Sequence, residues 1–146
     1  MPASAPERIL CDTSFVGLTE KGIPGHWPGE VVERLDRAIL AISVITLAEV
    51  RAGHIYAGWG TKRVEVAENR LETFVQIPLD LEVVSRWAEL QAANLKGAWN
   101  VGNNDLWIAA TAVSRGLHLA TCDGDHRRIK DGRLGLMHLP AKAGGS

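Results

Sequence analysis

ILCDTS, residues 9–14, is an apolar run that ends on an aspartate, and LATCDGD, residues 119–125, has the same arrangement. Each of the two cysteines of the chain stands directly before an aspartate. Two interpretations are open. The Cys-Asp pairs are metal ligands, or both runs are buried strands, short enough for a parallel sheet, that each bring a carboxylate to one edge of that sheet.

The rest of the chain alternates between strand-like and helical patterns. ILAIS at 39–43 and VQIP at 75–78 are further strand-like runs, and LGLMHL at 134–139 is the last. Parallel strands need crossover connections, so this alternation predicts a parallel sheet covered by helices on both faces. Between the strands, apolar residues recur at helical spacing in 31–40, 44–58, 61–74, 80–97 and 105–116, the last two closed by Gly97 and Gly116.

Size and composition predict one compact domain spanning residues 1–146, with flexible tails at 1–7 and 141–146. Hydrophobic residues make up 46% of the chain and charged residues 23%, which is ordinary for a soluble globular protein. The net charge of -1 means that any contact with nucleic acid must come from a local basic patch.

The sequence carries no sign of a membrane span or a signal peptide. No apolar run approaches the roughly 18 residues that a span needs, and MPASAPER lacks a basic-then-apolar layout. We therefore expect a cytoplasmic protein with reduced thiols and no contact with membranes. A zinc site would need closely spaced cysteine or histidine pairs, and only His118 and His126, on either side of Cys122, keep that possibility open.

Every acidic residue of interest has an ordinary structural explanation. Asp12 suits a helix N-cap, and Thr46 with Glu49 matches a capping box. Asp105 stands in the first turn of a helix, where the helix dipole favours a carboxylate. The Asp-Gly-Asp sequence at 123–125 is typical of a turn.

Their positions in the expected fold favour a common site. Asp12 and Asp123 directly follow strands, and Glu49 and Asp105 lie near helix starts, so all four are expected at the carboxyl edge of the sheet, where ligands bind. Two carboxylates about 4 Å apart repel by about 4 kcal/mol at an effective dielectric of 20. Capping does not explain such an assembly, whereas a divalent cation does, and oxygen ligands favour Mg²⁺ or Mn²⁺.

A hard cation held by carboxylates suits phosphoryl chemistry. Nearby basic residues, Arg51, Arg127 and Arg128, are candidates for contacts with RNA phosphates, although a solvated surface explains each of them as well. Trp27, Trp59 and Trp99 lie in or beside loops, where they could stack on RNA bases or bury against a partner protein.

The ordered set ILCDTS, SVITLAEVRAG, NNDLWIAATAVSRG and LATCDGDHRRI resembles the PIN-domain nucleases, and the chain length resembles that of their VapC-type toxins. The resemblance covers roughly residues 8–140, with NDLWIAATA as its most specific part. It implies a three-layer α/β/α fold with four or five parallel strands, and an endoribonuclease activity that depends on Mg²⁺ or Mn²⁺. It also implies a cognate VapB-type antitoxin and a homodimer, or a heterotetramer or larger complex with that antitoxin.

By position, the resemblance assigns the catalytic and metal-binding roles to four residues, namely Asp12, Glu49, Asp105 and Asp123. Asp125 matches a variable fifth metal-binding position, and Thr13, Asn104 and Thr121 match supporting polar positions. His126 departs from the pattern, because an aromatic residue, usually phenylalanine, is common there.

Two other functions are alternatives to the toxin. One is a housekeeping PIN-like nuclease without an antitoxin, and the other is a phospho-acceptor signalling domain, which also places an aspartate after a parallel strand. The signalling domain would need an acidic pair at the end of the first strand, and this chain has Cys11 before Asp12 in place of a second acid.

Overall fold

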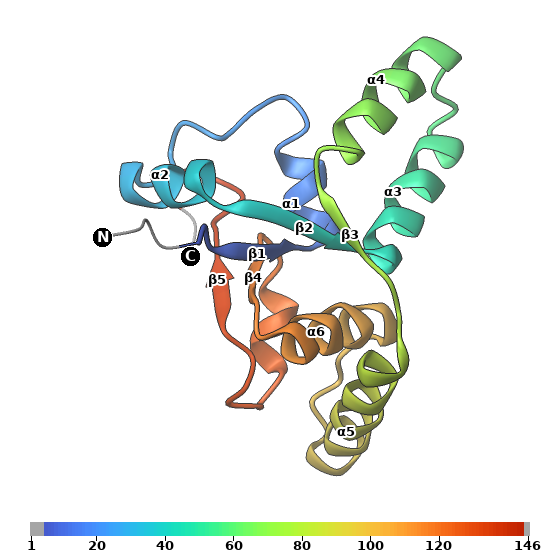
Figure 1. The fold of residues 1–146 in the computed structure, drawn as a ribbon, viewed down its shortest axis with the longest axis vertical. Helices are drawn as coiled ribbons and strands as arrows, with labels where there is room; N and C mark the ends of the chain where they lie inside the picture. Colours follow the sequence, from blue (N-terminus) through green and yellow to red (C-terminus); the bar gives the residue numbers. More distant parts are fainter. Residues whose placement is uncertain (1–4, 145–146) are drawn as a thin grey trace.

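A five-stranded parallel sheet forms the centre of the computed structural model, which describes residues 5–144 (Figure 1). The strands lie in the order β3-β2-β1-β4-β5, and each pairs in parallel with its neighbours. Their bounds are Arg8–Cys11 for β1, Ile39–Ser43 for β2, Val75–Ile77 for β3, His118–Thr121 for β4 and Leu136–His138 for β5. The predicted parallel sheet is confirmed, with five strands.

Strand β1 occupies the middle of the sheet and is buried on both faces. Leu10 pairs with Ala41 of β2 on one side and with Leu119 of β4 on the other. Ile9, Leu10 and Cys11 have no exposed surface. Ile9 and Cys11 pack with one cluster of core residues and Leu10 with another, as the alternation of side chains along a strand requires.

Helices cover both faces of the sheet and make three layers, as predicted (Figure 1). Residues of α1, α2 and α4 pack with Ile9 on one face, and α3 lies beside them. On the other face α6 packs on the sheet and α5 packs on α6, with Trp87 and Trp107 stacked at 4.7 Å between ring centroids. The helices are α1 (Thr13–Leu18), α2 (Gly29–Arg37), α3 (Val44–Tyr56), α4 (Thr61–Leu71), α5 (Leu81–Gly97) and α6 (Asn103–Arg115).

Two local features differ from the expected pattern. The helix that begins after the expected N-cap Asp12, α1, has only six residues, too few to show an apolar period in the sequence. At the end of α5 the left-handed residue is Ala98 (φ 50°), and Gly97 remains helical. A Cβ atom on Gly97 would lie 2.7 Å from Nε1 of Trp99, so this glycine provides space for the indole rather than a left-handed turn. Gly116 does take the expected left-handed conformation, with φ 64°.

The ends of the chain extend beyond the described residues. Residues 1–4 and 145–146 of the two predicted flexible tails lie outside them. Among residues 5–144, no helix combines the length and the apolar character needed to cross a bilayer.

The central position of β1 predicts a large stability effect for a core truncation. We expect Leu10→Ala to lower the free energy of unfolding by about 2–5 kcal/mol, because Leu10 is fully buried between tightly packed layers. Urea unfolding followed by circular dichroism measures the change. Leu95→Ala is the matched control: Leu95 on α5 is 71% exposed, so its loss should change stability by less than about 0.5 kcal/mol. If Leu10→Ala and Leu95→Ala lowered the free energy of unfolding equally, this would contradict the placement of Leu10 in the core.

Candidate active site

Asp12 anchors the site at the end of β1. It is the N-cap of α1, and its Oδ1 accepts hydrogen bonds from the backbone N–H of Phe15 at 2.9 Å and the Ser14 hydroxyl at 2.7 Å. The residue is only 2% exposed. The expected capping role is therefore real, and the same carboxylate also belongs to the acidic site.

Thr121 connects the ends of β1 and β4. Its hydroxyl is fully buried, donates to Oδ2 of Asp12 and accepts from the backbone N–H of Asp123 at 2.9 Å. Asp123 in turn caps the short 3₁₀ helix η1 (Gly124–Arg128), accepting from the backbone N–H of Asp125 at 2.9 Å. One hydroxyl group thus fixes the positions of two candidate ligands relative to each other.

Glu49 reaches the site from the second turn of α3. The expected capping box with Thr46 is wrong, because Ser43 caps α3 instead. The Glu49 carboxylate is consequently free to face other elements. It accepts from the Thr13 hydroxyl at 2.6 Å and from the side-chain amide of Asn104 at 3.3 Å. The supporting positions Thr13 and Asn104 therefore hold this carboxylate from two sides.

Asp105, Asp123 and Asp125 form the tightest acidic group. One carboxylate oxygen from each lies within 4.8 Å of the other two, and this is the only group of three or more possible ligands of this kind among residues 5–144. Asp105 comes from the first turn of α6, so the chain between β3 and β4 does bring it to this edge. Glu49 and Asp105 also line a cavity of about 400 Å³.

The electrostatic environment of Asp105 opposes its ionisation. Burial raises the pKa of the Asp105 carboxyl above its ordinary value, and His126 partly offsets this increase. The negative charges of Asp123 and Glu49 raise the pKa further. A divalent cation at this position would reverse the balance by compensating several negative charges at once.

His126 is the residue whose contribution the sequence did not reveal. Its imidazole is 1% exposed and lies between two carboxylates, with Nδ1 3.5 Å from Oδ2 of Asp12 and Nε2 3.7 Å from Oδ1 of Asp105. Nε2 has no hydrogen-bond partner in the part of the chain that the structure describes. A buried polar atom without a partner, facing carboxylates, fits a site that is completed by a ligand. The surrounding oxygen donors fit a hard divalent cation.

Sulfur does not take part in the acidic group. Both cysteines are free thiols; Cys11 is buried at the end of β1, and Cys122 is half-buried directly after the neighbouring strand β4. His118 lies at the start of β4, half-exposed and 3.7 Å from Glu7, far from the position a zinc site with Cys122 would need. The interpretation of the Cys-Asp pairs as ends of adjacent strands is therefore the correct one.

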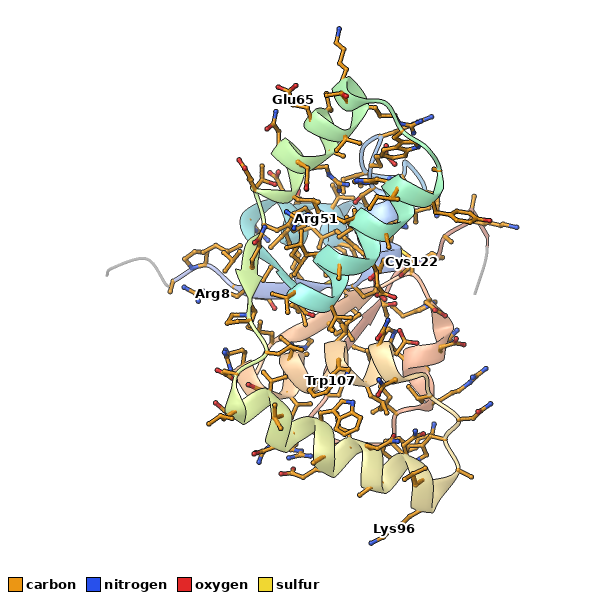
Figure 2. All side chains as sticks on the ribbon, turned by 90° about the vertical axis from the view of Figure 1, so that its right-hand side faces the viewer. Arg8, Arg51, Glu65, Lys96, Trp107 and Cys122 are labelled. Carbon is orange, nitrogen blue, oxygen red and sulfur yellow. The ribbon has the colours of Figure 1, made fainter. Side chains whose placement is uncertain are left out.

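The three candidate arginines have different surroundings. Arg51 pairs with Glu68 of α4 at 2.7 Å and stands on α3, above the sheet in Figure 2. Arg128 lies 3.4 Å from Asp125, close to the acidic group. Arg127 has no carboxylate within 4.0 Å among the residues of the described range.

The loop tryptophans are less available than expected. Trp27 is 4% exposed, stacks on Phe15 and donates through Nε1 to the Pro140 carbonyl at 2.8 Å, so its predicted stacking on RNA is wrong. Trp59 is half-buried, with His54 stacked on the ring at 4.4 Å and the guanidinium of Arg63 over it at 3.6 Å.

Comparison with known proteins agrees with this geometry. The family model described as "PIN domain" matches residues 9–132. Ribonuclease VapC4 of Mycobacterium tuberculosis is 37% identical over 136 residues, covering 85% of this chain and 92% of the relative. Ribonuclease VapC5 of the same organism is 32% identical over 133 residues, covering 84% and 88%. The chain therefore belongs to the PIN-domain family, and to the VapC group within it.

Solved structures give the same result for the fold. The crystal structure of VapBC-5 from Mycobacterium tuberculosis, a member of the VapBC family of toxin-antitoxin systems, contains a chain that is 27% identical. It superposes with a TM-score of 0.69 over 92% of this chain and 100% of that chain. VapBC-1 from nontypeable Haemophilus influenzae, at 23% identity and a TM-score of 0.75, covers 90% of this chain and 97% of its counterpart and supports the fold.

The raised pKa of Asp105 predicts how the site affects stability. Folding raises the pKa of the Asp105 carboxyl, so as pH rises the unfolded chain loses this proton before the folded protein does. The free energy of unfolding is therefore lowered above the folded-state pKa and is unaffected below the unfolded-state pKa. In EDTA, Asp105→Asn should therefore raise the melting temperature by a few degrees at pH 7, and this gain should shrink toward acid pH.

Calorimetry at several pH values, without and with added Mn²⁺, measures both effects. Mn²⁺ should raise the melting temperature of the wild type more than that of Asp105→Asn, because binding stabilises only the folded state. Glu65→Gln, at an exposed residue of α4, is the control and should behave like the wild type. If Asp105→Asn had a lower melting temperature than the wild type in EDTA at pH 7, this would contradict the inference that the ionised Asp105 carboxylate destabilises the folded protein.

Proposed function

We propose that this chain is a metal-dependent endoribonuclease toxin that cleaves RNA phosphodiester bonds and is neutralised by a cognate VapB-type antitoxin. The observation that carries the proposal is the group of three carboxylates within 4.8 Å, bordered by Asp12 and Glu49 and backed by a buried imidazole. The names of the VapC4 and VapC5 relatives as ribonucleases support RNA as the substrate.

Asp105, Asp123 and Asp125 are the residues that would hold Mg²⁺ or Mn²⁺, with Asp12 and Glu49 at the border of the group. When bound, the cation would orient a phosphate oxygen and neutralise negative charge that develops on the phosphate. The existing hydrogen bonds explain why these ligands need little rearrangement. Asp12 is held by Ser14 and Thr121, and pre-positioned charged groups are more effective than mobile ones.

Glu49 is the best placed group for proton transfer. Its carboxylate is half-buried at the rim of the 400 Å³ cavity, and Thr13 and Asn104 orient it without neutralising its charge. A carboxylate fixed in this way can accept the proton of a water molecule that attacks the phosphate. Because Glu49 lies outside the tightest acidic group, we assign it this role ahead of metal binding.

Antitoxin control follows from the class of structural neighbours. The VapBC-5 structure is a member of a family of toxin-antitoxin systems, and its matched chain covers 92% of this one. A housekeeping nuclease of the same fold is the second candidate. Expression in bacteria distinguishes the two: the toxin should arrest growth and be rescued by its antitoxin, whereas a housekeeping enzyme should do neither. We expect the protein to act in the cytoplasm, where its RNA substrate would be found.

The carboxylate site predicts a loss of cleavage when Asp12 is neutralised. Asp12→Asn keeps the size of the side chain but removes one negative charge, so RNA cleavage should fall at least about a hundredfold, since a bound cation contributes several kcal/mol to catalysis. Cleavage of cellular RNA, read by sequencing of the new ends after brief expression, is the measurement.

Two controls accompany this test. Thermal unfolding of Asp12→Asn separates lost chemistry from lost folding, because Asp12 also caps α1. Glu65→Gln should cleave at the wild-type rate. Cleavage by the wild type that persists in excess EDTA would exclude a metal-dependent mechanism.

A further inference from the structure

A second cavity, of about 220 Å³, lies at the same edge of the sheet on the side of β5. Its lining includes Cys122 and Gly124, the two neighbours of Asp123, and two cationic side chains, Arg127 and Lys142. His138 also lines it, but burial and the charge of Arg127 lower the pKa of this imidazole below its ordinary value. Cys122 is labelled in Figure 2, between the upper and lower helical layers. We call this feature the basic cavity. Among residues 5–144, no carboxylate lines it, unlike the cavity bordered by Glu49 and Asp105.

Arg127 contributes a free positive charge to the basic cavity. Its guanidinium lies over the backbone of Gly124, where a Cβ atom would approach Nη2 to 2.9 Å. No carboxylate lies within 4.0 Å of Arg127 or Lys142 among residues 5–144, whereas the adjacent Arg128 pairs with Asp125. A cationic cavity whose charges have no counter-ion among these residues favours an anionic ligand.

The wall that carries Lys142 is attached to the fold. After β5, the backbone N–H of Leu139 bonds to the Thr121 carbonyl at 2.8 Å. The next carbonyl, that of Pro140, accepts from Nε1 of Trp27 and contacts Nε2 of His26, each at 2.8 Å. The segment that reaches Lys142 is therefore held against the loop before α2 and kept beside the acidic site.

Asp123 lies between the two sites, because its neighbours Cys122 and Gly124 line the basic cavity and its own carboxylate belongs to the acidic group. The basic cavity and the acidic site thus meet at Asp123 with opposite electrostatic character. A polyanion that must approach clustered carboxylates gains from such a neighbouring positive surface.

We propose that the basic cavity binds a second phosphate group of the RNA chain, next to the phosphate that enters the acidic site. The inference rests on the proposed ribonuclease function and adds a binding subsite to it. Arg127 and Lys142 supply the charge, and the positions of the two sites along the edge define the path of the RNA backbone over the protein.

Binding of a fluorescent single-stranded RNA tests the proposal without cleavage. In EDTA, fluorescence anisotropy is measured over a series of salt concentrations for the wild type, Arg127→Gln, Lys142→Gln and the double variant. Each single change should weaken binding about three- to tenfold and reduce the slope of log K against log salt by about 0.7, as loss of one phosphate contact on a single strand requires.

Matched controls remove the same charge elsewhere. Arg37→Gln lies at the end of α2, at the opposite edge of the sheet, and Arg128→Gln removes the arginine that pairs with Asp125. Arg37→Gln should leave affinity and slope unchanged, and Arg128→Gln should change them less than Arg127→Gln does. Thermal unfolding verifies that all variants are folded.

The outcomes separate this inference from the proposed function. Unchanged RNA affinity and slope in the double variant, or no measurable RNA binding by the wild type, would overturn the subsite. The subsite would also be overturned if the double variant bound the antitoxin more weakly while its RNA affinity stayed unchanged. The cavity would then be a contact surface for the antitoxin. Cleavage by the wild type with Mn²⁺ is measured in parallel. If the wild type does not cleave RNA but the variants lose RNA affinity as expected, the nuclease function is rejected and the phosphate subsite is supported.

Discussion

The parallel pairing of β1 with β4 is the constraint on which the site depends. Cys11 lies opposite Ala120, so the next residues, Asp12 and Thr121, emerge side by side where the two strands end. The Thr121 hydroxyl can then bond to Asp12 and to the backbone of Asp123 at once. A shift of one residue in this register would turn these side chains to the opposite face of the sheet and separate the carboxylates.

The carboxylates of the site carry unequal electrostatic costs. Asp12 is almost completely buried, but the hydrogen bonds from Phe15 and Ser14 to one oxygen and from Thr121 to the other stabilise its charge. Among residues 5–144 no such set of donors surrounds the Asp105 carboxylate, and its pKa is raised. The fold has thus surrounded one carboxylate with local hydrogen-bond donors and left the other, whose ionisation burial opposes, dependent on a cation. Such an arrangement couples metal binding to the stability of the site.

The sequence predicted the sheet and the acidic cluster because both follow from short-range patterns. Apolar runs that end on Asp12 and Asp123 determine strand ends, and parallel strands end at a common edge. The orientation of Glu49 could not be read in this way. Its spacing from Thr46 matched a capping box, but Ser43 is the residue that caps α3, so Glu49 lies in the second turn of the helix. The burial of Trp27 depends on Pro140, a contact across more than a hundred residues that no local pattern encodes.

The 3₁₀ helix η1 explains why acidic and basic surfaces can lie so close together. In a helix with three residues per turn, consecutive side chains point about 120° apart. His126 points inward between Asp12 and Asp105, Arg128 turns toward Asp125, and Arg127 turns toward the basic cavity. Three adjacent residues therefore contact three different surroundings. Asp123, which caps this helix, fixes the rotation of the whole turn, so the same carboxylate that belongs to the acidic site also sets the direction of the free arginine.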